Sequence, residues 1–183
     1  MRTIKVPTRD QVDAKAQQIL DKVKSQLGMV PNLYATIAYS SDTLENYLNF
    51  SSKAGKDSFS GKEMEAIKLA VSEVNGCEYC LAAHTAIAKM NGFTEDETIQ
   101  LREGSIADAK LNTLSTLAAE VAQNRGKVSQ NKLDEFFAAG YDEKALIDFL
   151  AVVMEISFTN YTHNLTQVPV DFPKAKSLSE SAA

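Results

Sequence analysis

The chain contains only two cysteines and two histidines among its 183 residues. Both cysteines and one histidine lie in a single segment, Cys77 to His84, so any thiol chemistry must take place there. A disulfide between Cys77 and Cys80 would close a loop too short to stabilise a fold by much. In a reducing compartment, a pair at this spacing is typical of catalytic or metal-binding chemistry.

The chain also lacks a basic cluster and a long apolar run. With a net charge of −5 and a pI of about 5.1, it has no basic surface to neutralise phosphates, so neither nucleic acid nor an anionic membrane is expected as a partner. No apolar run approaches the roughly 18 residues of a membrane span, and the start MRTIKVPTRD lacks the apolar core of a signal peptide. We therefore expect a cytoplasmic protein without a membrane partner.

The sequence reads as a succession of helices, and we find no convincing strand. Apolar residues recur at helical spacing, and glycine, proline and capping residues separate the segments. This pattern predicts an all-α protein with one domain over residues 1–183 and a loose tail at about 174–183. The residues expected at or near the helix starts are Thr8 or Asp10, Pro31, Ser41, Ser60, Thr94, Asp108, Ser129 and Asp142.

Cys77, Cys80 and His84 stand at positions i, i+3 and i+7, which form one face of a helix. Asn75-Gly76 interrupts the preceding apolar pattern, so the cysteines are expected in the first turn of a new helix. Free N–H groups in that turn favour a thiolate over a thiol. Glu65 is expected on the preceding helix, where its carboxylate can reach Cys77 or His84, directly or through a water, as a proton relay.

Two other interpretations of these residues stay open at this point. The cysteines can be buried structural thiols, although two of them on one helix face beside a histidine would be an unusual way to fill a core. Alternatively, C-x-x-C with His84 supplies three ligands that zinc accepts, but a structural zinc site takes a fourth, usually from a second cysteine pair that this chain lacks. We expect neither a metal nor a cofactor.

The phrase AVSEVNGCEYCLAAH, with Glu65 twelve residues ahead of the first cysteine of C-x-x-C-x-x-x-H, resembles the signature of the AhpD-like, peroxidase-related branch of the carboxymuconolactone decarboxylase superfamily. The resemblance implies an AhpD-like helical bundle that forms a homo-oligomer (dimer, trimer or hexamer) and acts as a thiol-dependent hydroperoxide reductase. In that reaction Cys80 attacks the peroxide, Cys77 donates a proton and then forms the disulfide, and Glu65 and His84 relay protons. An external thiol donor, a lipoyl group or a thioredoxin-like protein, would restore the dithiol.

One position departs from this pattern. The prototype peroxidase of the family has a histidine between its cysteines, where this chain has Tyr79. A phenol with a pKa of about 10 cannot replace a base near neutral pH, which bears on catalytic efficiency more than on the type of reaction.

Two alternative functions stay open. One is a redox sensor or thiol-disulfide oxidoreductase that uses the same disulfide. The other is a lyase like the superfamily's decarboxylases, although these lack the cysteine pair.

A weak internal repeat accompanies the motif. Shifted by 80 residues, AIKLAVSEVNGCEYCLAAH aligns with LIDFLAVVMEISFTNYTHN, and Asn160 then stands opposite Cys80. This similarity fits a duplicated helical unit whose second copy kept only its packing. His163 has no partner in the sequence and is interpreted as structural, and the apolar segment 146–158 as core or oligomer interface.

Overall fold

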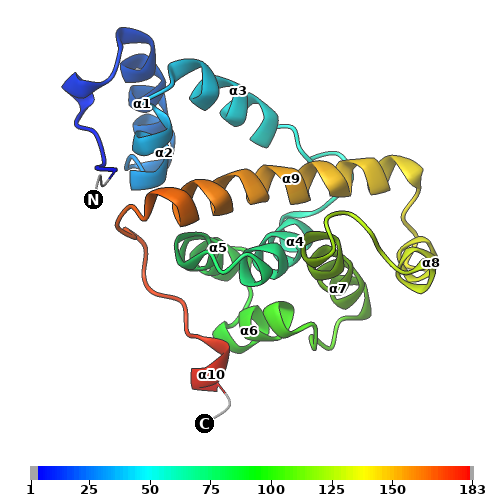
Figure 1. Cartoon of the computed structure of the whole chain (residues 1–183). Helices are drawn as coiled ribbons and strands as arrows, with labels where there is room; N and C mark the ends of the chain where they lie inside the picture. The colour runs from blue at the N-terminus through cyan, green and yellow to red at the C-terminus, as the bar shows by residue number, and fades with distance from the viewer. Residues whose placement is uncertain (1–3, 182–183) are drawn as a thin grey trace.

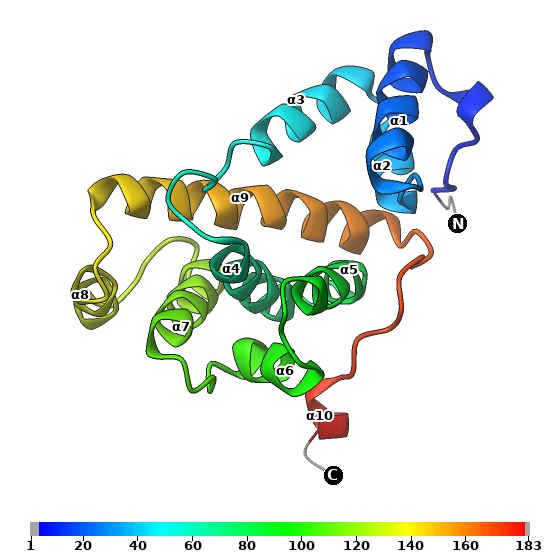
Figure 2. The ribbon, with the colours of Figure 1, turned by 180° about the vertical axis from the view of Figure 1, so that it is seen from behind.

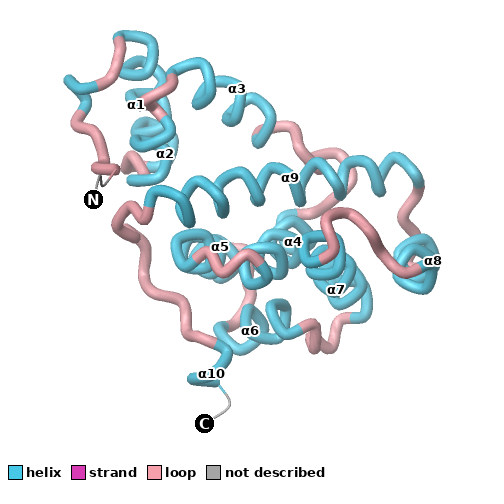
Figure 3. Tube along the Cα trace, viewed as in Figure 1, coloured by secondary structure: helices cyan, strands magenta, loops and turns pink. Residues whose placement is uncertain are grey.

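The computed structural model describes residues 4–181, and Figures 1 and 3 show them as helices joined by loops. No strand occurs in this part of the chain, so the all-α prediction is confirmed. A 3₁₀ turn, Arg9–Gln11, precedes the first α-helix. The α-helices are α1 Ala14–Leu27, α2 Asn32–Ile37, α3 Ser41–Ser51, α4 Gly61–Val74, α5 Glu78–Met90, α6 Glu95–Glu103, α7 Ala109–Gln123, α8 Gln130–Ala138, α9 Glu143–Thr166 and α10 Leu178–Ser181.

Helix α9 runs through the middle of the molecule, between two groups of helices. Figures 1 and 2 show α1 to α3 on one side of it and α4 to α8 on the other. Helix α4 packs against α5, α6, α7 and α9, and its buried face includes Ala66, Ile67 and Ala70. Glu65 lies on this buried helix, so the packing that makes the core also fixes the carboxylate in position.

Most helix starts follow the sequence signals. Ser60 and Thr94 each form the expected capping box, and the carboxylates of Asp108 and Asp142 accept N–H groups of the first turns of α7 and α9. The prediction that Thr8 or Asp10 caps the first long helix is wrong. Asp13 caps α1, since its Oδ1 accepts the Ala16 N–H at 2.8 Å, while the 3₁₀ turn separates Thr8 from the helix.

Within the described residues, α9 is the one helix whose length and composition would allow it to cross a membrane. Half of its most apolar window is buried inside the bundle, and Glu155, Asn160 and His163 on this helix are buried as well. A buried polar face of this kind needs partners from neighbouring helices. Helix α9 therefore serves as the central helix of the bundle.

The outer face of α9 carries a stripe of exposed apolar side chains, spaced three or four residues apart. Met154 is 57% exposed and Leu165 is 84% exposed. A contiguous apolar stripe on a helix is typical of an interaction surface. The stripe consists of Ile147, Leu150, Met154, Phe158, Tyr161 and Leu165.

The segment after α9 returns along α5 towards α6 (Figure 1). Asp171 in this segment accepts the Asn32 N–H at 2.9 Å, and Arg102 donates to the Lys176 carbonyl at 2.7 Å. The tail expected to be loose is thus anchored at Lys176 and ends in α10, while residues 182–183 lie outside the described residues. The anchor is a backbone carbonyl, which sequence patterns do not reveal.

Candidate active site

The turn between α4 and α5 sets the position of the cysteines. Gly76 has φ of +61°, in the left-handed region that glycine adopts without a steric penalty. The Cys77 N–H then donates to the Ser72 carbonyl at 3.0 Å, and Cys77 becomes the N-cap of α5. Its sulfur accepts the Cys80 N–H at 3.2 Å, so the first turn of α5 supplies a donor to this thiol.

Cys77 and Cys80 are free thiols whose sulfur atoms lie 2.6 Å apart. Both side chains are almost fully buried, but they differ in access. Cys80 lines a cavity, whereas Cys77 has no surface on it and is 0% exposed. A molecule in the cavity can therefore reach Cys80, whose sulfur is in contact with the sulfur of Cys77.

The cavity has a volume of about 360 Å³, which is within the range of small-molecule sites. Helices α1 to α5 and α9 and the segment after α9 all contribute to its walls. One part of the wall is apolar and consists of Leu27, Met29, Pro31, Leu33, Ala83, Ile87, Met90 and Phe172. The remaining part carries polar groups or sulfur and consists of Tyr34, Tyr47, Ser51, Glu65, Lys68, Tyr79, Cys80, His84, Glu155 and Thr159.

Glu65 and His84 meet on this wall. His84 Nδ1 lies 2.8 Å from Glu65 Oε2, and the Glu65 carboxylate is 5% exposed. Of the two contacts that the sequence allowed for this carboxylate, the structure shows the one with His84. The helical register places His84 one turn from Cys80, and both line the same cavity. A buried carboxylate that holds an imidazole in position is a common arrangement for proton transfer.

The surroundings of the two thiols favour the loss of a proton from one of them and oppose it at the other. The pKa of Cys77 is lowered, first by the hydrogen bond from the Cys80 thiol and then by the Cys80 N–H and the Asn160 side chain. The pKa of Cys80 is raised, because its thiol is engaged by Cys77 and is buried. The first proton therefore leaves from Cys77, and the sequence-based expectation of a more acidic thiol in this turn applies to Cys77 and not to Cys80.

Tyr79, between the two cysteines, is engaged in structural hydrogen bonds. Its hydroxyl donates to Asp171 Oδ1 at 2.6 Å and accepts the Leu33 N–H at 3.3 Å. Burial and the bond to Asp171 raise the pKa of this phenol above its usual value. Tyr79 thus joins α2, α5 and the segment after α9, and it has no role as a base near neutral pH.

Sequence reasoning missed a second polar group in the cavity, formed by Lys68 and Glu155. Lys68 Nζ lies 3.0 Å from Glu155 Oε2, and Glu155 is 2% exposed. Glu155 Oε1 accepts hydrogen bonds from Tyr47 Oη at 2.5 Å and from Ser51 Oγ at 2.8 Å. The available signal was a charged residue in the middle of the apolar segment 146–158, which only the packing of α9 against α4 connects to Lys68.

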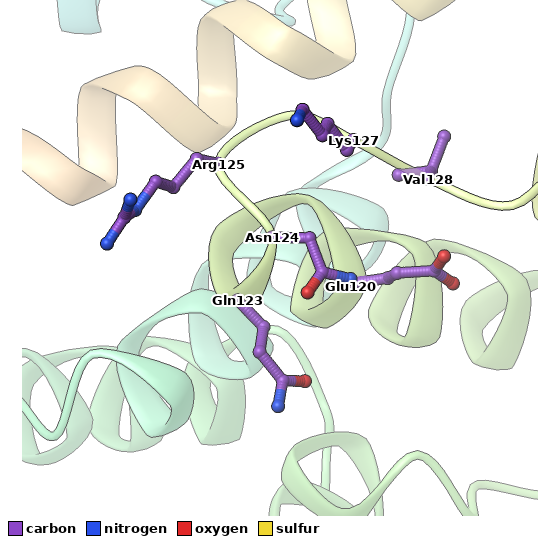
Figure 4. A pocket seen from close by; sticks show the side chains of 6 residues that line it. All are labelled: Glu120, Gln123, Asn124, Arg125, Lys127 and Val128. Atoms are coloured by element: carbon purple, nitrogen blue, oxygen red, sulfur yellow. The ribbon is translucent and has the colours of Figure 1, made fainter.

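A second hollow, of about 510 Å³, lies at the C-terminal end of α7. Figure 4 shows that the side chains of Glu120, Gln123 and Arg125 point in different directions there. Without convergent groups, this hollow offers no chemistry. Among residues 4–181, no three His, Cys, Asp or Glu side chains are grouped so that they could hold a metal ion.

Comparison with known proteins gives two sequence matches. The sequence model of the carboxymuconolactone decarboxylase family matches residues 41–124, a range that includes Glu65 and the whole cysteine segment. The uncharacterized protein YdfG of Bacillus subtilis is 27% identical over 100 residues, which cover 52% of this chain and 67% of YdfG.

Solved structures share the fold over most of the chain. An uncharacterized peroxidase-related protein from Ralstonia eutropha, described as having an alkylhydroperoxidase AhpD core, is 20% identical with a TM-score of 0.76 and covers 87% of both chains. The C82A variant of the debrominase Bmp8, in complex with 2,3,4-tribromopyrrole, is 16% identical with a TM-score of 0.76 and covers 93% of this chain and 92% of its own. At these identities the similarity establishes the fold alone.

Proposed function

Since the carboxymuconolactone decarboxylase family model matches the segment with Glu65 and both cysteines, and the chain has the AhpD-like fold, we propose that it is a thiol-dependent hydroperoxide reductase. One observation carries the proposal: Cys80 lines the cavity, and the sulfur of Cys77 lies 2.6 Å from the Cys80 sulfur. A peroxide needs one accessible thiol to attack it, and a second thiol within bonding reach completes the reduction as a disulfide.

The reaction begins with the thiolate on Cys77 and the proton on Cys80. When a hydroperoxide lies against Cys80, its sulfur attacks the terminal oxygen while the thiol proton passes to Cys77. The S–O bond forms, the O–O bond breaks, and its electron pair leaves with the alkoxide. Cys80 is now a sulfenic acid and the peroxide is reduced to an alcohol after protonation. The Cys77 sulfur then attacks the Cys80 sulfur, water leaves, and the disulfide forms.

Glu65 and His84 act as the proton relay between the cavity and the thiols. The carboxylate fixes the imidazole through Nδ1, so that Nε2 is free to exchange protons with Cys80 or with water in the cavity. Glu65 and His84 thus transfer protons, while Cys80 and Cys77 form the S–O and S–S bonds. Tyr79 takes no part in the proton transfer, since its hydroxyl is engaged with Asp171 and Leu33.

An external dithiol must restore Cys77 and Cys80 after each turnover. Because Cys80 is 3% exposed inside the cavity, a slender dithiol such as a lipoyl group reaches it more easily than the surface of a folded thioredoxin-like protein does. The protein is proposed to work in the reducing cytoplasm, where such donors occur. Assembly into a homo-oligomer is proposed to use the apolar stripe of α9.

The direct test is the consumption of cumene hydroperoxide by the reduced protein, with dihydrolipoamide as donor. Wild type is compared with Cys80→Ser and Cys77→Ser. We expect wild type to turn over, Cys80→Ser to be inactive, and Cys77→Ser to react once and stop at a sulfenic acid that dimedone traps.

Other outcomes identify the alternatives. A disulfide that forms once in wild type and is not renewed by any thiol donor indicates a redox sensor. Exchange with disulfide substrates without peroxide consumption indicates a thiol-disulfide oxidoreductase, and decarboxylation of a lactone indicates a lyase. Bromide release from 2,3,4-tribromopyrrole, the ligand in the debrominase structure, without reaction with hydroperoxides would point to reductive dehalogenation.

A further inference from the structure

The leaving oxygen of the peroxide lies beyond the reach of Cys77. An attacking sulfur approaches the O–O bond along its axis, so the leaving oxygen departs on the side of the peroxide that faces away from Cys80. That side is the cavity. Cys77 has no surface on the cavity and is fully buried, with its sulfur in contact with the Cys80 sulfur. The negative charge that develops on the leaving oxygen must therefore be met by another group of the cavity wall.

Lys68 is the cation on that wall. It follows Glu65 by three residues on α4, so both side chains emerge on the same face of the helix. Its side chain is 12% exposed, and Glu155 is its only hydrogen-bond or ion-pair partner among residues 4–181. An ammonium group carries three N–H donors, so two remain to be used by a molecule in the cavity.

Glu155 is positioned to keep Lys68 charged and oriented. Its Oε1 is occupied by the hydroxyls of Tyr47 and Ser51, which leaves Oε2 to hold the ammonium group. Burial opposes the charge on Lys68, but the attraction of Glu155 and Glu65 outweighs burial and raises the pKa of Lys68 above its usual value. A buried ion pair contributes little net stability, so its presence at a cavity wall calls for a functional explanation.

We propose that Lys68 is a catalytic residue that stabilises and protonates the oxygen leaving from the hydroperoxide, and that Glu155 is its positioning residue. The inference rests on the proposed peroxide reduction at Cys80. When the O–O bond breaks, the alkoxide takes a proton from the Lys68 ammonium group and departs as the alcohol. The neutral amine, next to two carboxylates, regains its proton from water in the cavity. His84 and Glu65 keep their role at the thiols.

This role predicts a dependence on the leaving group. A donor at the leaving oxygen matters most when that oxygen leaves as a strong base, as with tert-butyl hydroperoxide, and little when it leaves as a carboxylate, as with peracetic acid. If Lys68 acted only by promoting the thiolate of Cys80, both oxidants would be slowed by the same factor. The ratio of the two effects therefore separates the proposed role from a general electrostatic or structural one.

The experiment measures single-turnover oxidation of the reduced protein by each oxidant in stopped flow. Lys68→Met should lower the rate with tert-butyl hydroperoxide by about 100-fold, and the rate with peracetic acid by no more than about threefold. Glu155→Gln, which keeps acceptors for Tyr47 and Ser51, should give a smaller loss with the same selectivity. Lys62→Met, on the same helix but outside the cavity, is the matched control and should leave both rates unchanged.

Because Lys68→Met leaves a buried carboxylate unpaired and can impair folding, the double variant Lys68→Met/Glu155→Gln is measured as well. It removes both charges together and should retain the leaving-group selectivity of the single variant. Equal slowing of both oxidants in these variants, or no slowing, overturns the role of Lys68 while the peroxidase assignment stands. A wild type that reacts with hydroperoxides no faster than a free thiol overturns the proposed function and this role with it.

Discussion

The side chain of Asn160 on α9 lies beside the thiol of Cys77 at the start of α5 and helps to lower the pKa of that thiol. The same amide donates to Ser72 Oγ at 3.1 Å and accepts from the Asn75 side chain at 2.9 Å. One residue of the central helix thus connects the end of α4, the turn before α5 and the thiol pair. In the internal alignment, Asn160 is the counterpart of Cys80, and in the fold these two positions lie against each other.

Replacing Asn160 with alanine is expected to raise the pKa of Cys77. The thiolate is the form that accepts the hydrogen bonds, so the loss of one donor moves thiolate formation to higher pH. The pH dependence of thiolate absorbance and of single-turnover peroxide reduction should both shift upward. Asn164→Ala is the matched control, since its amide donates to the Asn75 carbonyl at 2.7 Å. A Cys77 pKa that is the same in wild type and Asn160→Ala would contradict the assignment.

Replacing Glu65 with glutamine is expected to lower peroxide turnover by about 10- to 100-fold at neutral pH. The amide has no charge to stabilise a protonated His84, although it can still form one hydrogen bond to the ring. Glu63→Gln, two residues earlier on α4, keeps a residue that supports the capping box and should remain fully active. Equal turnover in the two variants would remove Glu65 from the proton relay.

Replacing Tyr79 with phenylalanine is expected to destabilise the fold by about 1–3 kcal/mol without lowering the catalytic rate by more than about twofold. The variant leaves the Leu33 N–H without its acceptor and deprives Asp171 of a donor. Urea unfolding and peroxide consumption measure the two effects, and Tyr39→Phe, at a 56% exposed position outside the apolar stripe, is the control. A large loss of turnover in a stably folded Tyr79→Phe variant would show that the phenol takes part in the chemistry.

The lowered pKa of Glu63 leads to a prediction of how the stability of the fold depends on pH. Burial alone would raise its pKa, but hydrogen bonds from Tyr141 and Ser60 and the nearby Lys110 outweigh burial and lower it from 4.5 to about 2. A carboxylate with a depressed folded-state pKa contributes stability above its unfolded value of 4.5, and this contribution is lost as the pH falls towards 2. The urea midpoint of wild type should therefore fall more steeply in this range than that of Glu63→Gln. Parallel curves would refute the assignment.

The apolar stripe on α9 predicts self-association. Introducing a charge at its centre, as in Met154→Glu or Leu150→Glu, should shift the mass in solution from an oligomer towards the single chain of 20.0 kDa. Sedimentation or light scattering gives the mass, and Ile4→Glu, at a 42% exposed apolar position outside the stripe, is the control. A wild type that is monomeric at all concentrations would rule out the homo-oligomer.

The sequence by itself determined the helices and the local face of the site. Capping residues and periodicity act within a few residues, so the starts at Ser60, Thr94, Asp108 and Asp142 and the shared face of Cys77, Cys80 and His84 could be read directly. The cap of α1 was misread because Thr8 and Asp13 are both good caps, and a 3₁₀ turn that local pattern does not reveal lies between them.

Only the tertiary structure decided which thiol faces the cavity, which thiol is the more acidic, and which distant groups surround them. These contacts join helices or segments that are far apart in the chain: Asn160 with Cys77, Lys68 with Glu155, and Asp171 with Tyr79. The burial of each thiol and the donors that surround it depend on how α9 packs against α4 and α5. The spacing of residues along the sequence does not reveal this packing. The order of the thiol pKa values follows from these contacts, because in a buried pair the neighbouring donors decide which sulfur holds the charge.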